Sequence, residues 1–302
     1  MTTPDPTKIF SLDRRAVLQA FDRASASYDA AAALQERVRN ELIDRLAELK
    51  VTPQAILDLG AGTGHASRAL KRAHPGAIVV AADIAPGMLA RAKAQSRWLR
   101  RFERVRADAY SLPFRDASFD LIYSSLMLQW CDDLDTAFGE IARVLKPGGL
   151  LLFSTFGPGT LAELREAWGK SGDAGNHVNH FFDPHALGSA LMHAGLSEPV
   201  LDVDRIVMRY PDARALMREL KAIGAHNVTA GRPRGLTGRK RLAAMTQAYE
   251  TLRGEDGLPA TYEVIHAICW GSERREHAPA DFPRETFIAP GAIGRRGKTT
   301  QT

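Results

Sequence analysis

A glycine-rich turn carries the first residues of this sequence whose types and spacing could do chemistry. An apolar run ends in an aspartate and is followed by three alternating glycines, in the pattern Asp58-x-Gly60-x-Gly62-x-Gly64. Glycine lets the backbone turn sharply and lie close against a ligand. Turns of this kind between a strand and a helix bind a dinucleotide, the phosphates of a nucleotide or S-adenosylmethionine, and their spacing distinguishes the three.

The spacing excludes the two phosphate ligands. A dinucleotide turn needs a third glycine three residues after the second, and this position is occupied by the large side chain of His65. A P-loop needs a lysine and a hydroxyl residue after four spacers, and the chain continues instead with His65, Ala66 and Ser67. The turn therefore favours S-adenosylmethionine, which carries no phosphate.

A second acidic residue supports a ligand with a ribose. Asp83 ends the next apolar run, nineteen residues after Gly64. In folds of this kind, an acid at the end of the second strand accepts hydrogen bonds from the ribose hydroxyls.

The elements that must position these residues alternate along the chain. Strand-like runs occur at Ala55–Leu59, Ile78–Asp83, Arg104–Ala107, Phe119–Ser124 and Leu150–Thr155. Helical patterns lie between them near 64–74, 86–98 and 133–145, the last of which stops at a Lys-Pro-Gly-Gly segment. This alternation predicts an α/β fold with a doubly wound, mostly parallel sheet.

The second half of the chain adds an antiparallel-looking extension. Two late strands are predicted near 200–210 and 261–270, with helices over about 211–224 and up to about 253 between them. One or two amphipathic helices, 17–49, precede the first strand.

Composition excludes several classes of protein. With 302 residues, 45% apolar and 25% charged, the chain is expected to be globular. It contains neither an apolar run long enough for a membrane span nor a secretory signal pattern, so we expect a cytoplasmic protein with no membrane partner. Two distant cysteines predict no disulfide, and the irregular spacing of His177, His180 and His185 predicts no metal site.

The net charge of +5 is unevenly distributed. Seven basic residues against one acid lie between Arg91 and Arg106, and nine against two lie between Arg209 and Arg241. Such concentrations attract acidic partners. Because no nucleic-acid-binding motif accompanies them, we expect no nucleic acid partner.

The turn from Asp58 to Gly64 resembles the first motif of class I S-adenosylmethionine-dependent methyltransferases. Later segments, "ADAYSLPF", "FDLIYSSLMLQW" and "ARVLKPGGLLLFS", resemble the motifs that follow in that family. The resemblance implies a Rossmann-like sheet of seven strands, an acid at Asp58 that orders the loop and the ammonium group of the donor, and an adenine contact at Asp108. The donor-binding residues expected from it are Asp58, Gly60, Gly62, Gly64, Asp83, Ile84, Asp108, Ala109 and Ser125.

Three segments outside this core resemble a narrower group, the malonyl-acyl-carrier-protein O-methyltransferases (BioC family) of biotin synthesis. They are "RRAVLQAFDRASASYDAAAALQERV", "FSTFGPGTLAELREAW" and "MRELKAIGAHNVTAGRPRGLTGRKRL". The resemblance implies methyl transfer to the free carboxylate of a malonyl thioester. A carboxylate is already ionised at neutral pH, so the reaction needs orientation and charge rather than a general base.

This resemblance suggests roles for residues around the acceptor. We expect Tyr28 on a lid helix, Arg165 as a fork for the carboxylate and Gln129 at the meeting point of donor and acceptor. The acidic acyl carrier protein would dock on Arg232, Arg234, Arg239, Lys240 and Arg241. The expected division is an N-terminal lid (1–50), a methyltransferase domain (51–271) with a helical insertion (about 211–253), and a disordered tail (272–302).

The sequence also allows other functions. Another class I small-molecule methyltransferase, such as a quinone-pathway enzyme, would share the donor motifs. The respiratory complex I assembly factor that hydroxylates an arginine resembles the second half of the chain, including "RYP" and "PATY". A protein that uses the donor pocket only structurally would also share the donor motifs. The sequence does not decide whether the malonyl group is carried by an acyl carrier protein or by coenzyme A.

Overall fold

A seven-stranded sheet forms the centre of the molecule, in the order β3-β2-β1-β4-β5-β7-β6. The computed structural model describes residues 11–96, 100–172, 177–225, 227–229 and 238–272. Five strands run parallel to one another, β1 (Ala55–Leu59), β2 (Ile78–Asp83), β3 (Glu103–Arg106), β4 (Phe119–Ser125) and β5 (Leu145–Phe156). β7 (Leu258–Gly271) pairs antiparallel with both β5 and the edge strand β6 (Leu196–Tyr210). The predicted α/β class and the mostly parallel, doubly wound sheet are confirmed.

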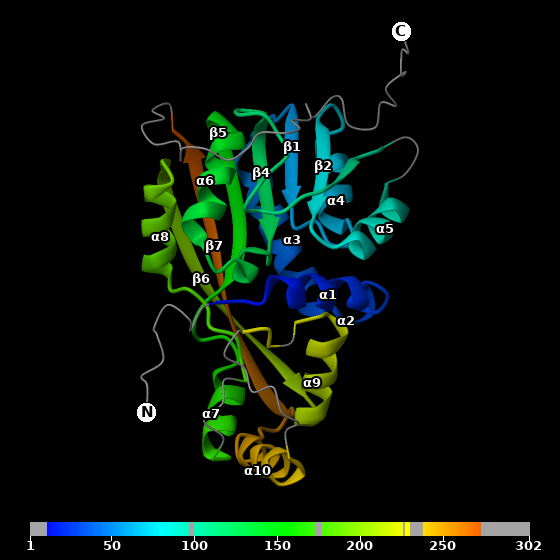
Figure 1. Ribbon diagram of the computed structural model, residues 1–302, viewed down its shortest axis with the longest axis vertical. Coiled ribbons are helices and arrows are strands. Elements are labelled where there is room, and N and C mark those ends of the chain that lie inside the picture. Colours follow the sequence, from blue (N-terminus) through cyan, green and yellow to red (C-terminus); the bar gives the residue numbers. More distant parts are fainter. Residues whose placement is uncertain (1–10, 97–99, 173–176, 226, 230–237, 273–302) are drawn as a thin grey trace.

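Helices cover both faces of the sheet (Figure 1). On one face, α3 (Ala33–Glu48), α4 (His65–Ala73) and α5 (Pro86–Gln95) bury apolar side chains against alternate residues of β1, β2, β4 and β5. On the other face, α6 (Leu134–Val144) and α8 (Pro184–His193) do the same. The central strands are buried on both faces, which explains their almost continuous apolar runs.

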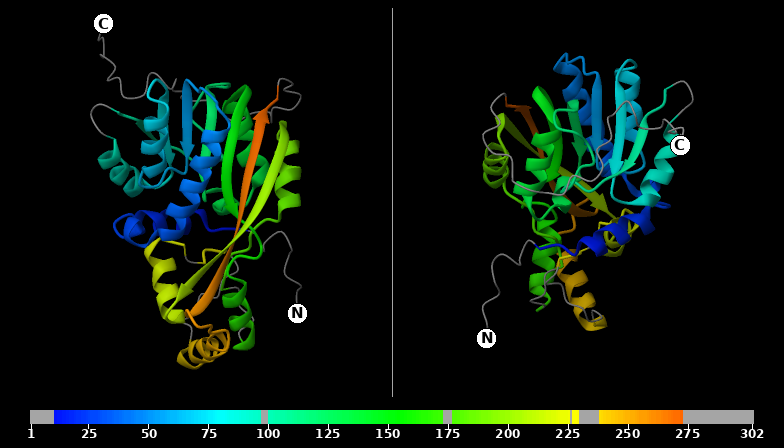
Figure 2. Two further views of the ribbon diagram at one scale, coloured as in Figure 1. Left: turned by 180° about the vertical axis from the view of Figure 1, so that it is seen from behind. Right: turned by 45° about the horizontal axis from the view of Figure 1, so that its top comes forward.

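A second core lies beyond the carboxyl ends of the parallel strands. The long strands β6 and β7 continue past the sheet as a twisted pair and carry α7 (Ala162–Lys170), α9 (Ala213–Ala222) and α10 (Arg239–Glu250) (Figure 2). Buried aromatic and aliphatic residues of these elements form one cluster with Leu34 and Val38 of α3. The helices α9 and α10 are the helical insertion predicted between the last two strands.

Two short helices lie between the two cores, α1 (Arg14–Ala24) and α2 (Tyr28–Ala31). α1 begins at an N-cap, where the Asp13 carboxylate accepts from Ala16 N at 3.0 Å. Together with α3 they replace the one or two helices predicted for 17–49. No helix in the described ranges is long and apolar enough to cross a membrane.

Several predicted boundaries were wrong. β5 begins at Leu145, so the Lys-Pro-Gly-Gly segment lies inside this strand rather than only ending the helix, because Leu145 pairs with Phe119 of β4. β6 begins at Leu196 instead of about 200. Pro199, which has no N–H to donate, coincides with an irregularity between Ser197 and Val200 that disguises the start of the strand. The tail beyond residue 272 lies outside the described residues.

Candidate functional site

The glycine turn after β1 is fixed by backbone geometry. Gly60 has φ +77°, and a Cβ there would overlap the side chain of Met127. Gly62 has φ +53°, and a Cβ there would meet no atom within 4 Å. Gly60 N and Ala61 N both donate to the carbonyl of Ala82, at 2.8 and 3.0 Å. The turn therefore presents bare backbone to an open space beside the end of β2.

Asp83 joins this turn to the start of α5. Its Oδ2 accepts from Gly62 N at 2.8 Å, and its Oδ1 accepts from Ala85 N at 2.8 Å. Burial raises the pKa of Asp83, and the backbone donors oppose that rise. Each carboxylate oxygen has lone-pair capacity left, as recognition of two ribose hydroxyls requires.

Asp58 and Gly64 support the turn from behind. Ser67 Oγ donates to Asp58 Oδ2, and burial raises the pKa of this carboxyl to about 7. A Cβ at Gly64 would lie 2.8 Å from Ala92 Cβ, so this glycine allows α4 and α5 to pack closely. Neither residue lines a cavity next to the turn. In this structure Asp58 and Gly64 stabilise the shape of the turn and do not face the open space beside it.

Asp108 follows β3 at the same edge of the sheet and is joined to the N-terminal segment. Its Oδ1 accepts from Tyr110 N at 3.1 Å, and its Oδ2 forms an ion pair with Arg14 of α1. The Arg14 guanidinium lies 4.5 Å from the centroid of the Tyr110 ring. Tyr110 OH in turn donates to Asp132 Oδ1 at 2.8 Å. These contacts fix the start of α1 over the ends of β3 and β4.

Two small cavities at this edge of the sheet share the turn. One of about 110 Å³ extends from Gly60 and Asp83 to Asp108, and one of about 120 Å³ extends toward Arg39 of α3. We call them together the donor cavity. Of the residues predicted to bind the donor, seven line it: Gly60, Gly62, Asp83, Ile84, Asp108, Ala109 and Ser125.

The N-terminal helices cover the donor cavity. Tyr28 lines both of its parts, and burial next to Asp83 raises the pKa of its hydroxyl, which stays protonated. Asp29 accepts from Thr63 Oγ1 at 2.6 Å, and Asp22 accepts from Gly87 N at 2.6 Å. The two aspartates attach the covering helices to the glycine turn and to α5.

A larger cavity of about 840 Å³ lies between the two cores. We call it the acceptor cavity. Apolar side chains of β5, α7 and β7, among them Phe156, Leu164 and Tyr262, form much of its wall. It meets the donor cavity at two residues. Trp130 lines the acceptor cavity and the first donor part, and Gln35 lines the acceptor cavity and the second donor part.

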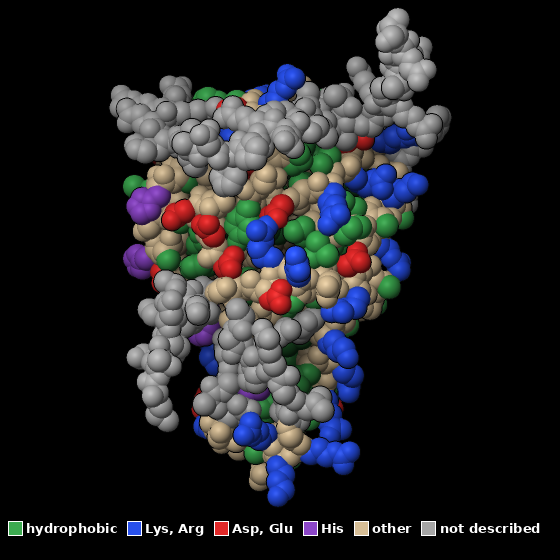
Figure 3. Space-filling model, in the orientation of Figure 1, with side chains coloured by type: hydrophobic (Ala, Val, Ile, Leu, Met, Phe, Trp, Pro, Cys, Tyr) green, Lys and Arg blue, Asp and Glu red, His purple; other side chains and the backbone are tan. Residues whose placement is uncertain are grey.

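The charged side chains among the described lining residues of the acceptor cavity are basic. Arg23 of α1 and Arg218 and Lys221 of α9 lie on its exposed rim, and no aspartate or glutamate lies among its described lining residues. In Figure 3, basic side chains gather along one edge of the lower part of the molecule, over the region of α9 and α10. Such a cavity favours an anionic ligand with an apolar body.

Comparisons with known proteins agree with this geometry. Residues 57–153 match the family model described as a methyltransferase domain. The YcgJ protein of Bacillus subtilis superposes with a TM-score of 0.54 at 20% identity, covering 78% of this chain and 99% of that one. A Bacillus halodurans protein described as a methyltransferase gives 0.54 at 18% identity, covering 78% and 98%. These likenesses establish the class I methyltransferase fold.

Closer relatives decide the family. A malonyl-[acyl-carrier protein] O-methyltransferase from Methylovorus sp. (strain MP688) is 48% identical over 276 residues, 89% of this chain and 93% of the relative. That of Halorhodospira halophila is 46% identical over 269 residues, 88% and 91%. The chain belongs to the malonyl-[acyl-carrier protein] O-methyltransferase family. The biotin biosynthesis bifunctional protein BioHC of Cellvibrio japonicus is 43% identical over 85% of this chain and 50% of that longer protein.

The acceptor side of this methyltransferase differs from the sequence prediction at Arg165. Its guanidinium donates to the carbonyls of Pro158 and Thr160, at 3.1 and 3.2 Å, and does not line the acceptor cavity. Burial lowers the pKa of Arg165. Gln129 does line the cavity, where its Nε2 donates to Leu126 O at 2.6 Å. Arg165 thus holds the loop before α7 and lies outside the lining of the acceptor cavity.

The rim cations and Gln35, which line the cavities, were not among the site residues predicted from the sequence. Arg218 and Lys221 belong to the basic segment from Arg209 to Arg241, but the family resemblance indicates Arg165 and the basic residues of 232–241 instead. Gln35 sits one helical turn after the lid helix, and its Oε1 is buried without a hydrogen-bond partner among the described residues. A lone glutamine on an amphipathic helix gives no signal in the sequence.

Proposed function

We propose that the protein transfers a methyl group from S-adenosylmethionine to the free carboxylate of a malonyl thioester, preferentially one carried by an acyl carrier protein. The observation that carries the proposal is the acceptor cavity, which has cations on its rim, no described acidic residue in its lining and a direct junction with the donor cavity at Trp130 and Gln35. The names of the relatives at 48% and 46% identity support the same reaction.

The donor cavity fits S-adenosylmethionine, which supplies a methyl group activated by a positively charged sulfur. The open backbone at Gly62 offers room for the amino-acid part, and Asp83 can accept from the ribose hydroxyls. Asp108 and Ala109 also line the cavity, and the adenine would lie beside them. Tyr28 would cover the donor and keep water from the reacting atoms.

The acceptor side needs no proton transfer. A malonyl carboxylate is ionised near neutral pH, so its oxygen can form the new O–C bond while the S–C bond breaks and both charges are lost. Arg23, Arg218 and Lys221 would attract the anion into the cavity, and Gln35 and Gln129 could direct it toward the donor. Catalysis then rests mainly on proximity and on orientation along the line of transfer.

An acyl carrier protein would dock near α10. Arg239, Lys240 and Arg241 are exposed at the start of this helix, while Arg232 and Arg234 lie outside the described residues. Acyl carrier proteins are acidic, so charge complementarity would increase the rate of encounter. Charge reversal at Lys240 and Arg241 should raise KM for the malonyl carrier protein and spare malonyl-coenzyme A. Equal losses with both substrates would contradict docking at this helix.

Rescue of a biotin auxotroph that lacks its own malonyl methyltransferase tests the role of the reaction. The gene for this protein should restore growth without biotin, and the Asp83→Asn variant should not. A stable, well-expressed protein that fails to rescue would contradict the proposal. The cytoplasmic location stays a prediction.

A further inference from the structure

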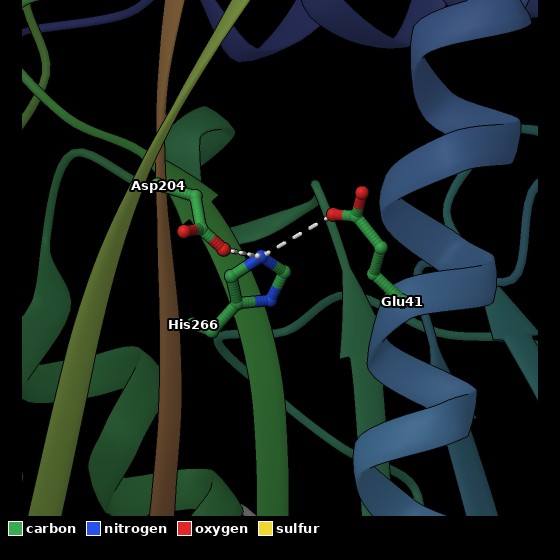
Figure 4. Close-up of side chains that lie close together, drawn as sticks. All are labelled: Glu41, Asp204 and His266. Carbon is green, nitrogen blue, oxygen red and sulfur yellow. Dashed lines mark ion pairs between the residues drawn. The ribbon is translucent and has the colours of Figure 1, made fainter.

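Three side chains that are far apart in the sequence meet on the face of the sheet covered by α3. Glu41 projects from α3, Asp204 from the edge strand β6 and His266 from β7 (Figure 4). His266 Nε2 lies 3.6 Å from Asp204 Oδ2 and 3.9 Å from Glu41 Oε2. The ligand atoms of the three residues all lie within 4.8 Å of one another. None of the three residues lines the donor or the acceptor cavity.

His266 is the decisive member of this cluster. Its side chain is only 2% exposed, and neither ring nitrogen has a hydrogen-bond partner among the residues that the structure describes. Both carboxylate oxygens are too far from Nε2 for a hydrogen bond, although the ring points this nitrogen at both of them. A buried polar side chain without a partner is rare in proteins, and a bound water or ion is one way to satisfy such a group.

The charges around His266 oppose one another, because Glu41, Asp202 and Asp204 attract a cation whereas Arg45 repels one. Burial lowers the pKa of His266, and the nearby Arg45 lowers it further, against the opposing effect of the surrounding carboxylates. A neutral imidazole offers a ring lone pair to a metal. Arg45 is itself bound to Asp202 Oδ2 at 2.7 Å and to Asp204 Oδ2 at 3.1 Å.

The separations also suit a small ion. Zinc binds imidazole nitrogen and carboxylate oxygen at about 2.0–2.2 Å, so two ligands of a tetrahedral zinc lie about 3.4 Å apart. The observed separations of 3.6 and 3.9 Å from Nε2 exceed this by a few tenths of an ångström. Glu41 and Asp204 are partly exposed, so they can rotate to close this gap and the site is accessible from solvent.

We propose that Glu41, Asp204 and His266 bind a divalent metal ion, zinc by its donor set, with water completing the coordination. The ion would link α3 to the antiparallel pair β6–β7. Because α3 also carries Gln35 at the junction of the two cavities, the link would stabilise the position of that helix. The site is structural and needs no part in methyl transfer.

Zinc titration of the metal-free protein tests the proposal, with a chromophoric chelator as competitor. The unmodified protein should bind one zinc ion in this site, and its Tm should rise by about 5 °C at a zinc concentration about 100-fold above Kd. Glu41→Gln and Asp204→Asn should each weaken binding at least tenfold and abolish the shift in Tm. Both positions are partly exposed, so these variants should fold, whereas His266→Gln is a secondary test because its side chain is buried.

Asp202→Asn is the matched control. Asp202 lies on the same strand as Asp204 and binds the same Arg45, but it does not belong to the cluster. This variant should keep both the zinc stoichiometry and the shift in Tm. The proposal is overturned if zinc binds the unmodified protein no more tightly than the Glu41→Gln variant, or if Asp202→Asn loses zinc to the same extent.

Discussion

The indole of Trp130 packs edge-on against the ring of Phe21, with centroids 5.0 Å apart and ring planes at 85°. Phe21 lies on α1, before the sheet begins, and Trp130 lies in the turn after β4. Trp130 forms part of the wall between donor and acceptor cavities, whereas Phe21 lines only the donor side. This contact holds the N-terminal helix against the place where the two substrates would meet.

Replacing Phe21 by alanine should weaken donor binding. An edge-to-face aromatic pair contributes about 0.5–1.5 kcal/mol, which corresponds to a change of about 2- to 12-fold in a binding constant. We expect Kd for S-adenosylmethionine, measured by calorimetry, to rise within this range. Phe182→Ala is the control, since Phe182 packs against the core that the sheet forms with α6 and α8 and lines neither cavity. Equal affinity of Phe21→Ala and the unmodified protein would contradict the role of this contact.

Asp83→Asn should have a larger effect on the donor. Hydrogen bonds to a charged group contribute about 1.5–3 kcal/mol, so Kd for S-adenosylmethionine should rise about 10- to 100-fold. Asp120 offers a matched comparison because it also accepts from two backbone N–H groups, Gln54 N at 3.0 Å and Ala55 N at 2.8 Å, at the other end of the sheet. Asp120→Asn should lower Tm without changing donor affinity. A similar loss of affinity in both variants would show only a general effect on folding.

Charge reversal on the rim of the acceptor cavity should act on the acceptor alone. Arg218→Glu and Lys221→Glu should each lower kcat/KM for malonyl-coenzyme A about 3- to 10-fold, because exposed charges interact modestly, while Kd for the donor stays the same. Arg214 lies exposed on the same helix and does not line the cavity, so Arg214→Glu is the control. The proposal for the rim fails if all three variants behave alike.

Asp58 should make stability depend on pH. Its pKa is raised to about 7 by burial, so the folded state holds this proton more tightly than the unfolded chain. The stabilisation is full below about pH 4 and is lost as the pH rises toward 7, with a slope of up to about 1.4 kcal/mol per pH unit. Urea unfolding of the unmodified protein and of Asp58→Asn, between about pH 4 and 7, measures this pH dependence of the free energy of unfolding. The free energy of unfolding of the asparagine variant should lack this contribution, and parallel curves would show that Asp58 does not titrate there.

The donor side could be predicted from the sequence because its residues are local. Gly60 and Gly62 lie just after β1, Asp83 is the last residue of β2, and parallel strands bring their carboxyl ends to one edge. The sequence did not show that the residues of the turn have different structural roles. Asp58 and Gly64 share the motif with Gly60, yet packing against Ser67 and Ala92 directs them away from the cavity.

The acceptor side could be predicted only in outline. The helical insertion and its positive charge could be predicted. The walls of the acceptor cavity, however, come from α1, α7, α9 and β7. These elements meet only because β6 and β7 extend far past the sheet. Arg165 looked suitable by type and position, and its bonds to the Pro158 and Thr160 carbonyls became visible only in three dimensions. The cluster of Glu41, Asp204 and His266 has no sequence signature for the same reason.

Transfer of a labelled methyl group from S-adenosylmethionine to malonyl-acyl carrier protein tests the central claim most directly. Mass spectrometry should find the label in the methyl ester of the malonyl thioester, and the acetyl thioester, which lacks the free carboxylate, should acquire none. Intact donor binding with no label on any malonyl thioester, or equal label on the acetyl thioester, would contradict carboxylate methylation.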